Sequence, residues 1–457
     1  MTEQFNQQEN DDIRYHLHPY TNARKHQEQG PLVITKGDGV YVEDIHGKRY
    51  IEAMAGLWSV ALGFSEQRLV DAALRQMQEL PFYHQFTHKT HELAAQFAKQ
   101  LIDACPVPMS KVFFTNSGSE ANDTVVKLLW YRSNALGQPQ KKKIISRLRA
   151  YHGVTIASAS LTGLVPNHKG FDLPIAGILH TSCPHYWREG KEGETEEQFA
   201  TRMAQDLEDM IVREGPDTIA AFIAEPVMGA GGVIVPPATY WEKIQAVLKK
   251  YDILLVADEV ICGFGRTGKM FASETFNMQP DIMVLSKQIS SSYQPLSAIL
   301  LNDKVFEPIA DESNKLGVLG HGFTAGGHPV AVAVGIENLK IIQERNLVEH
   351  AASVGEYFQQ RLQELADHPM VGEVRGLGLI AAVELVTDKQ RKVALETPGQ
   401  LGIAVGKEMQ NLGVIVRNIG DAIAFCPPLI ITKEQIDELV NVLRQAIDKV
   451  QAELVQK

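Results

Sequence analysis

The sequence predicts an α/β protein with a large domain built on a mainly parallel sheet and a smaller α+β domain. Three observations predict this class. Short apolar runs alternate with helical periodicity from about residue 66 to residue 330, a glycine-rich alternating segment precedes them, and mixed short strands and helices follow. Buried strands that alternate with helices form parallel βαβ units. A chain of 457 residues also has room for two or three domains.

The first part of the chain, residues 1–65, is expected to hold an N-terminal segment and part of the smaller domain. Residues 1–20 are polar and acidic and lack a basic stretch followed by an apolar one, so no signal peptide is expected. Residues 32–53, "LVITKGDGVYVEDIHGKRYIEA", alternate apolar and polar side chains around glycines. This pattern predicts a small antiparallel meander.

Residues 66–330 are predicted to form the large domain. Residues 66–80 and 91–104 repeat apolar side chains at helical spacing. Between and after such helices lie short apolar runs of the kind that form buried strands, at residues 111–116, 142–147, 219–226, 252–260 and 281–287.

Residues 331–457 are predicted to form the smaller C-terminal domain. Amphipathic helices are expected at residues 331–346, 354–368 and 434–454, and short strands at residues 377–386, 413–419 and 422–429. This mixture of elements predicts an α+β arrangement.

Net charge, apolar runs and cysteine spacing limit which partners the protein can bind and where in the cell we expect it. The net charge of −11 disfavours a nucleic-acid or anionic-membrane surface. No apolar run approaches the roughly 18 residues of a membrane helix. The four cysteines lie far apart without a CxxC pair, which argues against a disulfide framework and a zinc knuckle. We therefore expect reduced thiols in a cytoplasmic protein.

Residues that close the predicted strands are the first candidates for a site, because ligands bind at the carboxyl ends of parallel strands. The run "FFTNSGSEAND" ends in Asn116, Ser117, Gly118 and Ser119 and continues as a helix. Small residues at such a turn leave backbone N–H groups free for a phosphate. A helix start capped by Ser117 and Glu120 is the alternative interpretation.

An acid and a lysine close two consecutive strands. Asp258 follows five apolar residues, and Lys287 is the only charge in "VLSKQISSSYQPLSA", residues 284–298. At neighbouring strand ends the two could face one cleft, with the carboxylate holding a protonated ring nitrogen and the lysine acting as a nucleophile. A structural salt bridge is the alternative.

Two further motifs are rejected as sites. "GFGRTG", residues 263–268, fits G-x-G-x-x-G, but five residues separate it from the strand end and Pro280 limits a following helix. His84, His88 and His91 have a spacing compatible with zinc, yet no acid or cysteine completes the set. We predict no metal site.

Seven motifs together resemble those of one family: "FFTNSGSEAND", "AYHG", "AEPVMGAGG", "LLVADEVICGFGRTG", "LSKQISSSYQPLSA", "HGFTAGGHP" and "VRNIGDAIAFCPPL". They occur in the order of the class III aminotransferases, which are pyridoxal-phosphate (PLP) enzymes of fold type I. The resemblance extends from about residue 15 to residue 450. It implies a large domain with a mainly parallel seven-stranded sheet and PLP as cofactor.

The resemblance implies a role for each candidate. Lys287 resembles the Schiff-base lysine that also moves the proton at the substrate carbon, and Asp258 the carboxylate at the pyridine nitrogen. The resemblance implies that Ser117, Gly118 and Ser119 contact the phosphate and that Val260 and Tyr151 lie against the two faces of the ring. It implies that His152 lies beside Tyr151 and that Glu225 lies near Asp258. A further phosphate contact is implied for Thr324 of the neighbouring subunit. Thr324 thereby implies a homodimer with active sites at the interface.

The substrate side resembles the ω-amino acid and amine:pyruvate branch. Trp58 and Arg417 resemble its aromatic wall and its carboxylate-binding arginine, and Tyr83, Phe86 and Tyr151 are further expected lining residues. Ala230 stands where the ornithine and 4-aminobutyrate branch has a glutamate that supports 2-oxoglutarate as acceptor.

We therefore expect an ω-transaminase that moves an amino group from a primary amine or ω-amino acid to pyruvate by ping-pong chemistry. Alternatives within the family are a taurine:pyruvate enzyme, a diamine-forming transaminase of the biotin pathway and an aminomutase. A binding protein that has lost its chemistry is a different class, against which the presence of both Lys287 and Asp258 argues.

Overall fold

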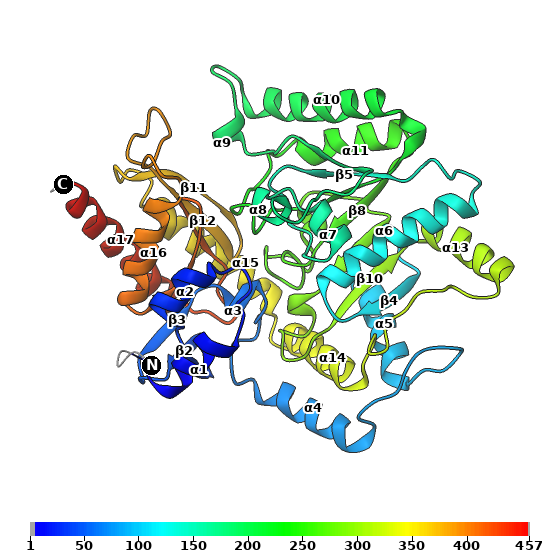
Figure 1. Ribbon diagram of the computed structural model, residues 1–457, viewed down its shortest axis with the longest axis horizontal. Helices are drawn as coiled ribbons and strands as arrows, with labels where there is room; N and C mark the ends of the chain where they lie inside the picture. Colours follow the sequence, from blue (N-terminus) through cyan, green and yellow to red (C-terminus); the bar gives the residue numbers. More distant parts are fainter. Residues whose placement is uncertain (1–4, 456–457) are drawn as a thin grey trace.

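A computed structural model describes residues 5–455 of the chain, so residues 1–4, 456 and 457 of the predicted terminal segments lie outside the described residues. At its centre lies a seven-stranded sheet (Figure 1). Its strands, in spatial order, are β4 (Lys111–Thr115), β10 (Ser297–Leu301), β9 (Ile282–Leu285), β8 (Leu254–Asp258), β7 (Ile219–Ala224), β5 (Lys143–Arg147) and β6 (Ile178–Thr181).

The central sheet is mainly parallel, as the sequence predicts. Only β10 runs against its neighbours β4 and β9, whereas β9, β8, β7, β5 and β6 pair in parallel. All five strands predicted for this domain are present. The two additional strands, β6 and β10, are not among the predicted ones, although they are as long as β9 and β4. In β6, "ILHT", only two of four residues are apolar, and no α-helix separates β10 from β9.

Helices cover both faces of the central sheet. Successive residues of a strand point to opposite faces, so Ile223 packs into one core and Phe222 into the other. One face is covered by α6 (Gly118–Ala135), α7 (Ile156–Leu161) and α13 (Asp303–Leu316), and the other by α5 (Glu92–Asp103), α10 (Glu196–Glu214), α11 (Tyr240–Lys250) and α14 (Pro329–Glu344). Helix α4 (Gln67–Glu79) packs on α14. The shorter helices are α8 (Val165–His168), α9 (Tyr186–Glu189), α12 (Ala272–Thr275), η1 (Pro216–Thr218) and η2 (Lys287–Ile289).

Two smaller sheets lie beside this domain. One has the order β1-β2-β3-β13 and the other the antiparallel order β11-β12-β15-β14. Because β13 pairs in parallel with β3, both ends of the chain contribute to one sheet. The boundaries near residues 65 and 330 stay predictions. The elements are α1 (Gln7–Tyr15), α2 (Ala23–Gln29), β1 (Ile34–Asp38), β2 (Tyr41–Asp44), β3 (Arg49–Glu52), α3 (Ala55–Trp58), α15 (Leu347–Gln363), β11 (Val371–Leu377), β12 (Ile380–Leu385), α16 (Gln400–Asn411), β13 (Val414–Ile415), β14 (Arg417–Ile419), β15 (Ala422–Phe425) and α17 (Lys433–Val455).

The described helices include none that is both long enough and apolar enough to cross a bilayer.

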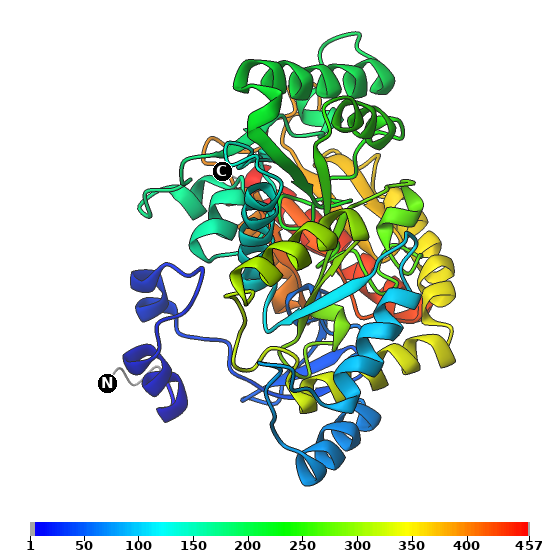
Figure 2. The same cartoon turned by 90° about the vertical axis from the view of Figure 1, so that its right-hand side faces the viewer.

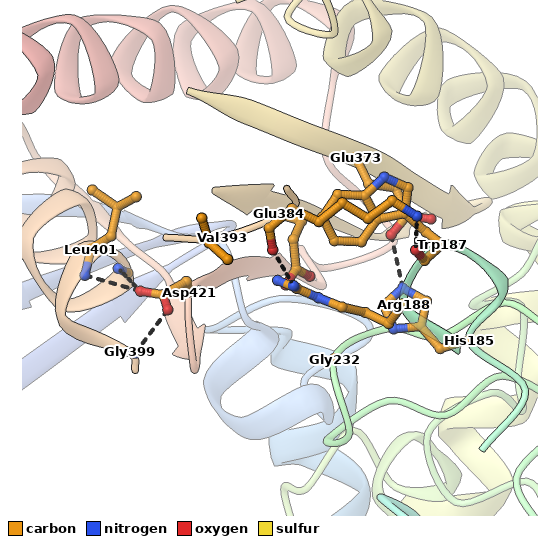
Figure 3. A network of polar contacts seen from close by, with 12 residues as sticks. His185, Trp187, Arg188, Gly232, Glu373, Glu384, Val393, Gly399, Leu401 and Asp421 are labelled. Carbon is orange, nitrogen blue, oxygen red and sulfur yellow. Dashed lines mark hydrogen bonds and ion pairs between the residues drawn. The ribbon is translucent and has the colours of Figure 1, made fainter. Parts of the chain in front are cut away.

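A network of charges joins the large domain to the C-terminal sheet (Figure 3). The buried Arg375 guanidinium lies 2.6 Å from Glu373 and 2.7 Å from Glu384 and donates to the Gly232 carbonyl at 2.9 Å. Arg188 lies 2.6 Å from the same Glu384 carboxylate. Burial raises the pKa of Glu384, but the two arginines outweigh it, and the pKa lies below its ordinary value.

We expect Arg375→Ala to lower the free energy of unfolding by about 3 to 5 kcal/mol, because the buried Glu384 would keep only Arg188 as counter-charge and the half-buried Glu373 would lose its guanidinium partner. Arg391→Ala is the matched control, since Arg391 is 82% exposed and pairs loosely with Asp388 at 3.8 Å. That control should change stability by less than about 1 kcal/mol. Denaturant unfolding of both variants measures the two changes in the free energy of unfolding. Equal changes would show that the ion pairs of Arg375 add no more stability than the exposed pair of Arg391.

Candidate active site

A cavity opens at the edge of the central sheet where β5, β7, β8 and β9 end. We call it the lysine cavity. It brings together eight of the residues predicted for cofactor binding: Gly118, Ser119, Tyr151, His152, Glu225, Asp258, Val260 and Lys287. The lining also includes Asn122, Gly153, Ile261 and Ser286, which the sequence analysis did not select.

The N-terminus of α6 faces this cavity. Ser117 is the N-cap residue, and its hydroxyl accepts a hydrogen bond from the Glu120 N–H at 3.1 Å. The capped helix start is therefore present, and Ser117 itself does not line the cavity. Gly118 and Ser119 follow in the first helical turn, where backbone N–H groups have no partner within the helix. An anion bound in the cavity would receive these donors and the positive end of the helix dipole.

Gly153 allows a second segment to approach this turn closely. Its φ is 134°, and a Cβ atom there would lie 2.5 Å from the Ser119 hydroxyl. The next residue, Val154, donates its N–H to the same hydroxyl at 3.0 Å. Glycine at position 153 is therefore required both by the backbone conformation and by the space available.

Asp258 is held at the end of β8 by three donors. His152 Nδ1 lies 2.7 Å from Asp258 Oδ2, Asn122 Nδ2 donates to the same oxygen at 3.0 Å, and the Val260 N–H donates to Oδ1 at 3.1 Å. Its carboxylate is 3% exposed. These contacts fix the orientation of the Asp258 carboxylate in the cavity wall. Within residues 5–455, Asp258 and Lys287 do not form an ion pair.

Lys287 begins η2, directly after β9 and Ser286. Its φ is 50°, a left-handed conformation that is strained for a residue with a side chain. The side chain reaches the lysine cavity, and desolvation lowers the pKa of the ammonium below its ordinary value, although Asp258 and Glu225 oppose this shift. A lysine with a lowered pKa has more of the neutral amine, which is the form that acts as nucleophile and base.

Two further buried acids have different surroundings. Glu225 accepts hydrogen bonds from the Tyr151 N–H at 3.0 Å and the Gly229 N–H at 2.9 Å, and burial raises its pKa. Glu259 points away from the cavity toward α12, where Ser273 donates both its N–H and its hydroxyl to the carboxylate. Burial raises the pKa of Glu259 to about 7.

A second cavity adjoins the first through Tyr151 and Lys287, which line both. We call it the arginine cavity because Arg417 lies in its wall, together with Trp58 and Ala230. Burial raises the pKa of Glu52, another lining residue, to about 8, so this carboxyl is mostly neutral at pH 7. No carboxylate oxygen in the described part of the chain lies within 4.0 Å of the Arg417 guanidinium.

Besides Ser117, three predicted residues lie outside both cavities. Tyr83 and Phe86 are 40% and 43% exposed in the segment between α4 and α5, so within one chain they do not line the substrate pocket. The Phe86 ring lies against Gly322, close in sequence to the exposed Thr324. These residues share one outward face.

The glycine motif at residues 263–268 and the histidines His84, His88 and His91, both rejected as sites from the sequence, do not have the geometry of such sites in the structure either. Residues 263–268 form a turn, and the first helix after them, α12, has only four residues. His91 contacts the Gly327 carbonyl at 2.7 Å, whereas His84 stacks on Tyr83. His84, His88 and His91 do not gather their ring nitrogens in one place in the structure.

Asn122 is the clearest residue missed by sequence reasoning. It is 1% exposed, and besides Asp258 it donates to the His152 carbonyl at 2.7 Å. Its position one turn into α6, after "NSGSEA", was the available signal, because a polar side chain there faces back toward the helix start.

Comparison with known proteins agrees with this geometry. The family "Aminotransferase class-III" matches residues 22–447. A γ-aminobutyrate transaminase 1, mitochondrial, from Solanum lycopersicum is 52% identical over 94% of this chain and 84% of its own.

Solved structures of transaminases superpose closely. The ω-transaminase from Pseudomonas jessenii in complex with PMP is 63% identical over 96% of this chain and 97% of its own, with a TM-score of 0.96. A transaminase with L-Ala is 66% identical over 93% of this chain and 100% of its own, with a TM-score of 0.92.

An engineered enzyme is similar as well. The thermostable ω-transaminase PjTA-R6 variant W58M/F86L/R417L, engineered for synthesis of bulky amines, is 62% identical over 97% of this chain and 99% of its own, with a TM-score of 0.97. The extent of these matches, together with the lysine cavity, shows that the chain belongs to the class III aminotransferases, PLP-dependent enzymes of fold type I.

Proposed function

We propose that this aminotransferase moves an amino group from a primary amine or an ω-amino acid to pyruvate. The observation that carries the choice of acceptor is the arginine cavity beside Lys287, where Arg417 has no acid partner among residues 5–455 and Ala230 occupies the wall. A guanidinium binds a carboxylate through two parallel hydrogen bonds. Because alanine supplies no charge to neutralise Arg417, the cavity suits a small keto acid with one carboxylate.

The lysine cavity fits PLP in three respects. The N-terminus of α6 offers N–H groups to the phosphate at Gly118 and Ser119, and Asp258 offers a fixed carboxylate to the pyridine nitrogen. Lys287 supplies the amine that holds the aldehyde carbon. His152 Nε2 and Asn122 Oδ1 are buried without a hydrogen-bond partner, as expected for polar atoms that face a ligand.

When bound, PLP supplies an electron sink for the carbanion at the substrate carbon. The chain supplies the acid–base chemistry and the orientation. Lys287 Nζ takes the proton from the substrate carbon, for which its lowered pKa suits it. Asp258, held by His152 and Asn122, keeps the pyridine nitrogen protonated. Arg417 holds the carboxylate of the keto acid.

Trp58 limits the size of the amine donor. It is 2% exposed at the end of α3, where Ala55, Gly56 and Trp58 all have positive φ, so its ring is held in the cavity wall by a constrained backbone. The similar enzyme engineered for bulky amines carries substitutions at Trp58, Phe86 and Arg417. This chain has the same residue types at those three numbers, which supports their assignment to the substrate pocket.

We also propose a homodimer in which Thr324, Tyr83 and Phe86 complete the active site of the partner subunit. The support is their position on an exposed face outside the cavities of their own chain. Sedimentation velocity of the holoenzyme should give twice the chain mass of 50.6 kDa. Sedimentation as a monomer with full activity would contradict this assembly.

A cytoplasmic location is proposed as well, supported by Cys105, Cys183, Cys262 and Cys426, which form no disulfide. Cell fractionation tests it, and recovery of the protein with a membrane or extracellular fraction would contradict it.

The proposed acceptor is tested by steady-state kinetics with pyruvate and 2-oxoglutarate, each paired with 1-phenylethylamine and with 4-aminobutyrate. A higher kcat/KM for pyruvate with both donors is expected. Poor activity with taurine and with diamines would exclude the taurine:pyruvate enzyme and the diamine-forming transaminase. A requirement for an external keto acid would exclude an aminomutase, because an aminomutase needs none.

Arg417→Ala should raise the KM for pyruvate about 10- to 100-fold, which corresponds to losing a charge-assisted hydrogen-bonded pair. The KM for 1-phenylethylamine, which has no carboxylate, should change much less. Arg417→Lys is the matched variant: it keeps the charge and loses the forked geometry, so an intermediate effect is expected. Equal changes in both KM values would place the carboxylate elsewhere.

A further inference from the structure

Three histidine side chains of the N-terminal segment converge on a single carboxylate, away from both cavities. His18 Nε2 lies 2.8 Å from Asp12 Oδ2, and His26 Nε2 lies 3.0 Å from the same oxygen. His16 Nδ1 lies 3.0 Å from Asp12 Oδ1. Asp12 comes from α1, His16 caps its C-terminus, His18 follows in an extended segment and His26 comes from α2. Figure 2 shows these two short helices, in dark blue, together at the edge of the molecule.

The three imidazoles are close to one another as well as to the carboxylate. The ring centroids of His16 and His18 are 4.4 Å apart, and those of His18 and His26 are 4.2 Å apart. One ligand atom each from Asp12, His16 and His18 all lie within 4.8 Å of one another. Tetrahedral zinc, with bonds of about 2.0 to 2.1 Å, requires donor atoms roughly 3.3 Å apart. Small movements of these three side chains would place three ligands around an ion, and His26, whose Nε2 lies 3.0 Å from Asp12 Oδ2, is the candidate for the fourth.

The cluster is partly sheltered from solvent. The side chains of His26, Asp12 and His18 are 9%, 21% and 27% exposed, whereas His16 is 62% exposed. The site thus has an inner side closed by His26 and an open side at His16 through which an ion can enter.

We propose that Asp12, His16, His18 and His26 bind one divalent transition-metal ion of the zinc type. Three imidazoles and one carboxylate form a donor set that suits zinc, cobalt, nickel and copper, whereas calcium and magnesium require mainly oxygen ligands. Nothing in the transamination chemistry uses these four residues.

The ion would join α1, the extended segment and α2 into one unit beside the substrate site. Pro19 and Tyr20, which directly follow His18, line the arginine cavity. Asn167 Nδ2 donates to the Tyr20 hydroxyl at 2.5 Å, which ties this turn to the large domain. Binding of the metal would hold the turn, and with it Tyr20, in the cavity wall.

The test uses the untagged full-length holoenzyme, because a polyhistidine tag would bind the same ions. After dialysis against EDTA, titration with Co²⁺ should give visible d–d bands that saturate at one equivalent per chain and disappear when Zn²⁺ is added. Zinc should also slow proteolytic cleavage within residues 1–30.

The double variant His18→Gln/His26→Gln and the single variant Asp12→Asn should lose the saturable bands while keeping the cofactor absorbance of a folded holoenzyme. His46→Gln is the matched control, since His46 lies in the same region, 3.4 Å from Glu9, but outside the cluster. It should bind Co²⁺ as the parent does. Absence of saturation at one equivalent, or equal loss in His46→Gln, would overturn the proposal. The proteolysis assay provides a second readout if a variant loses cofactor.

Discussion

Lys287→Ala should lower kcat by at least about 10⁴-fold, since one substitution removes both the nucleophile and the general base. The structure gives a reason why no neighbour replaces it. Lys287 is the only lysine that lines either cavity, and the other lining groups that titrate are acids, tyrosines, one histidine and one arginine. Arg417 does not act as a base at neutral pH, and Asp258 is engaged by His152 and Asn122.

The measurement is single-turnover kinetics with 1-phenylethylamine, with the purified variant reconstituted with PLP. The substitution leaves the left-handed backbone at residue 287 unchanged and removes only a buried side chain that has no ion-pair partner among the described residues. The variant should therefore stay folded and bind the cofactor without a covalent link. Cofactor content after gel filtration and the sedimentation coefficient serve as controls. Transamination at a rate near that of the parent enzyme would remove Lys287 from its assigned role.

Asp258→Asn should lower kcat by about 10²- to 10³-fold, the usual effect of removing one electrostatic partner from a reacting group. Asparagine keeps the shape at the end of β8 but carries no charge to hold a proton on the pyridine nitrogen. Its amide nitrogen would also take the place of one carboxylate oxygen, so it would give up either the bond from the Val260 N–H or the bonds from His152 and Asn122. The loss should therefore appear in kcat for every amine donor tested, with little dependence on donor size.

Glu259→Gln is the matched control for this substitution. Glu259 is the next residue, is fully buried and accepts hydrogen bonds from α12 instead of facing the lysine cavity. We expect this variant to lose about 1 to 3 kcal/mol of stability and to keep its kcat. If the two variants lose activity equally, the effect of Asp258 is structural and its assignment at the pyridine nitrogen is wrong.

The sequence predicts the parts of the fold that depend on local pattern. Apolar runs such as residues 252–260 and 281–287 identify buried strands, and the acid and lysine that close them point to one edge of the sheet, where Asp258 and Lys287 do line one cavity. β10 is not found in this way because it returns antiparallel to β9 with no α-helix between them, whereas the pattern that predicts this domain is one of strands alternating with helices.

The substrate side depends on contacts between distant segments, which a pattern does not specify. Tyr20 and Trp58 meet Arg417 in one cavity, although Arg417 lies more than 350 residues further along the chain. Glu52, a strand residue with no distinctive neighbours, becomes a mostly neutral acid only because those segments bury it. Tyr83 and Phe86 show the opposite case: aromatic residues in the expected segment that face outward within a single chain.

The visible absorbance of the purified holoenzyme tests the central claim most directly, because it follows both halves of the exchange in one cuvette. The account predicts a band at about 410 to 420 nm that bleaches with 1-phenylethylamine and returns with pyruvate. A band that returns with 2-oxoglutarate but not with pyruvate would contradict the proposed acceptor. A band that does not respond to primary amines or to ω-amino acids would contradict the proposed donors.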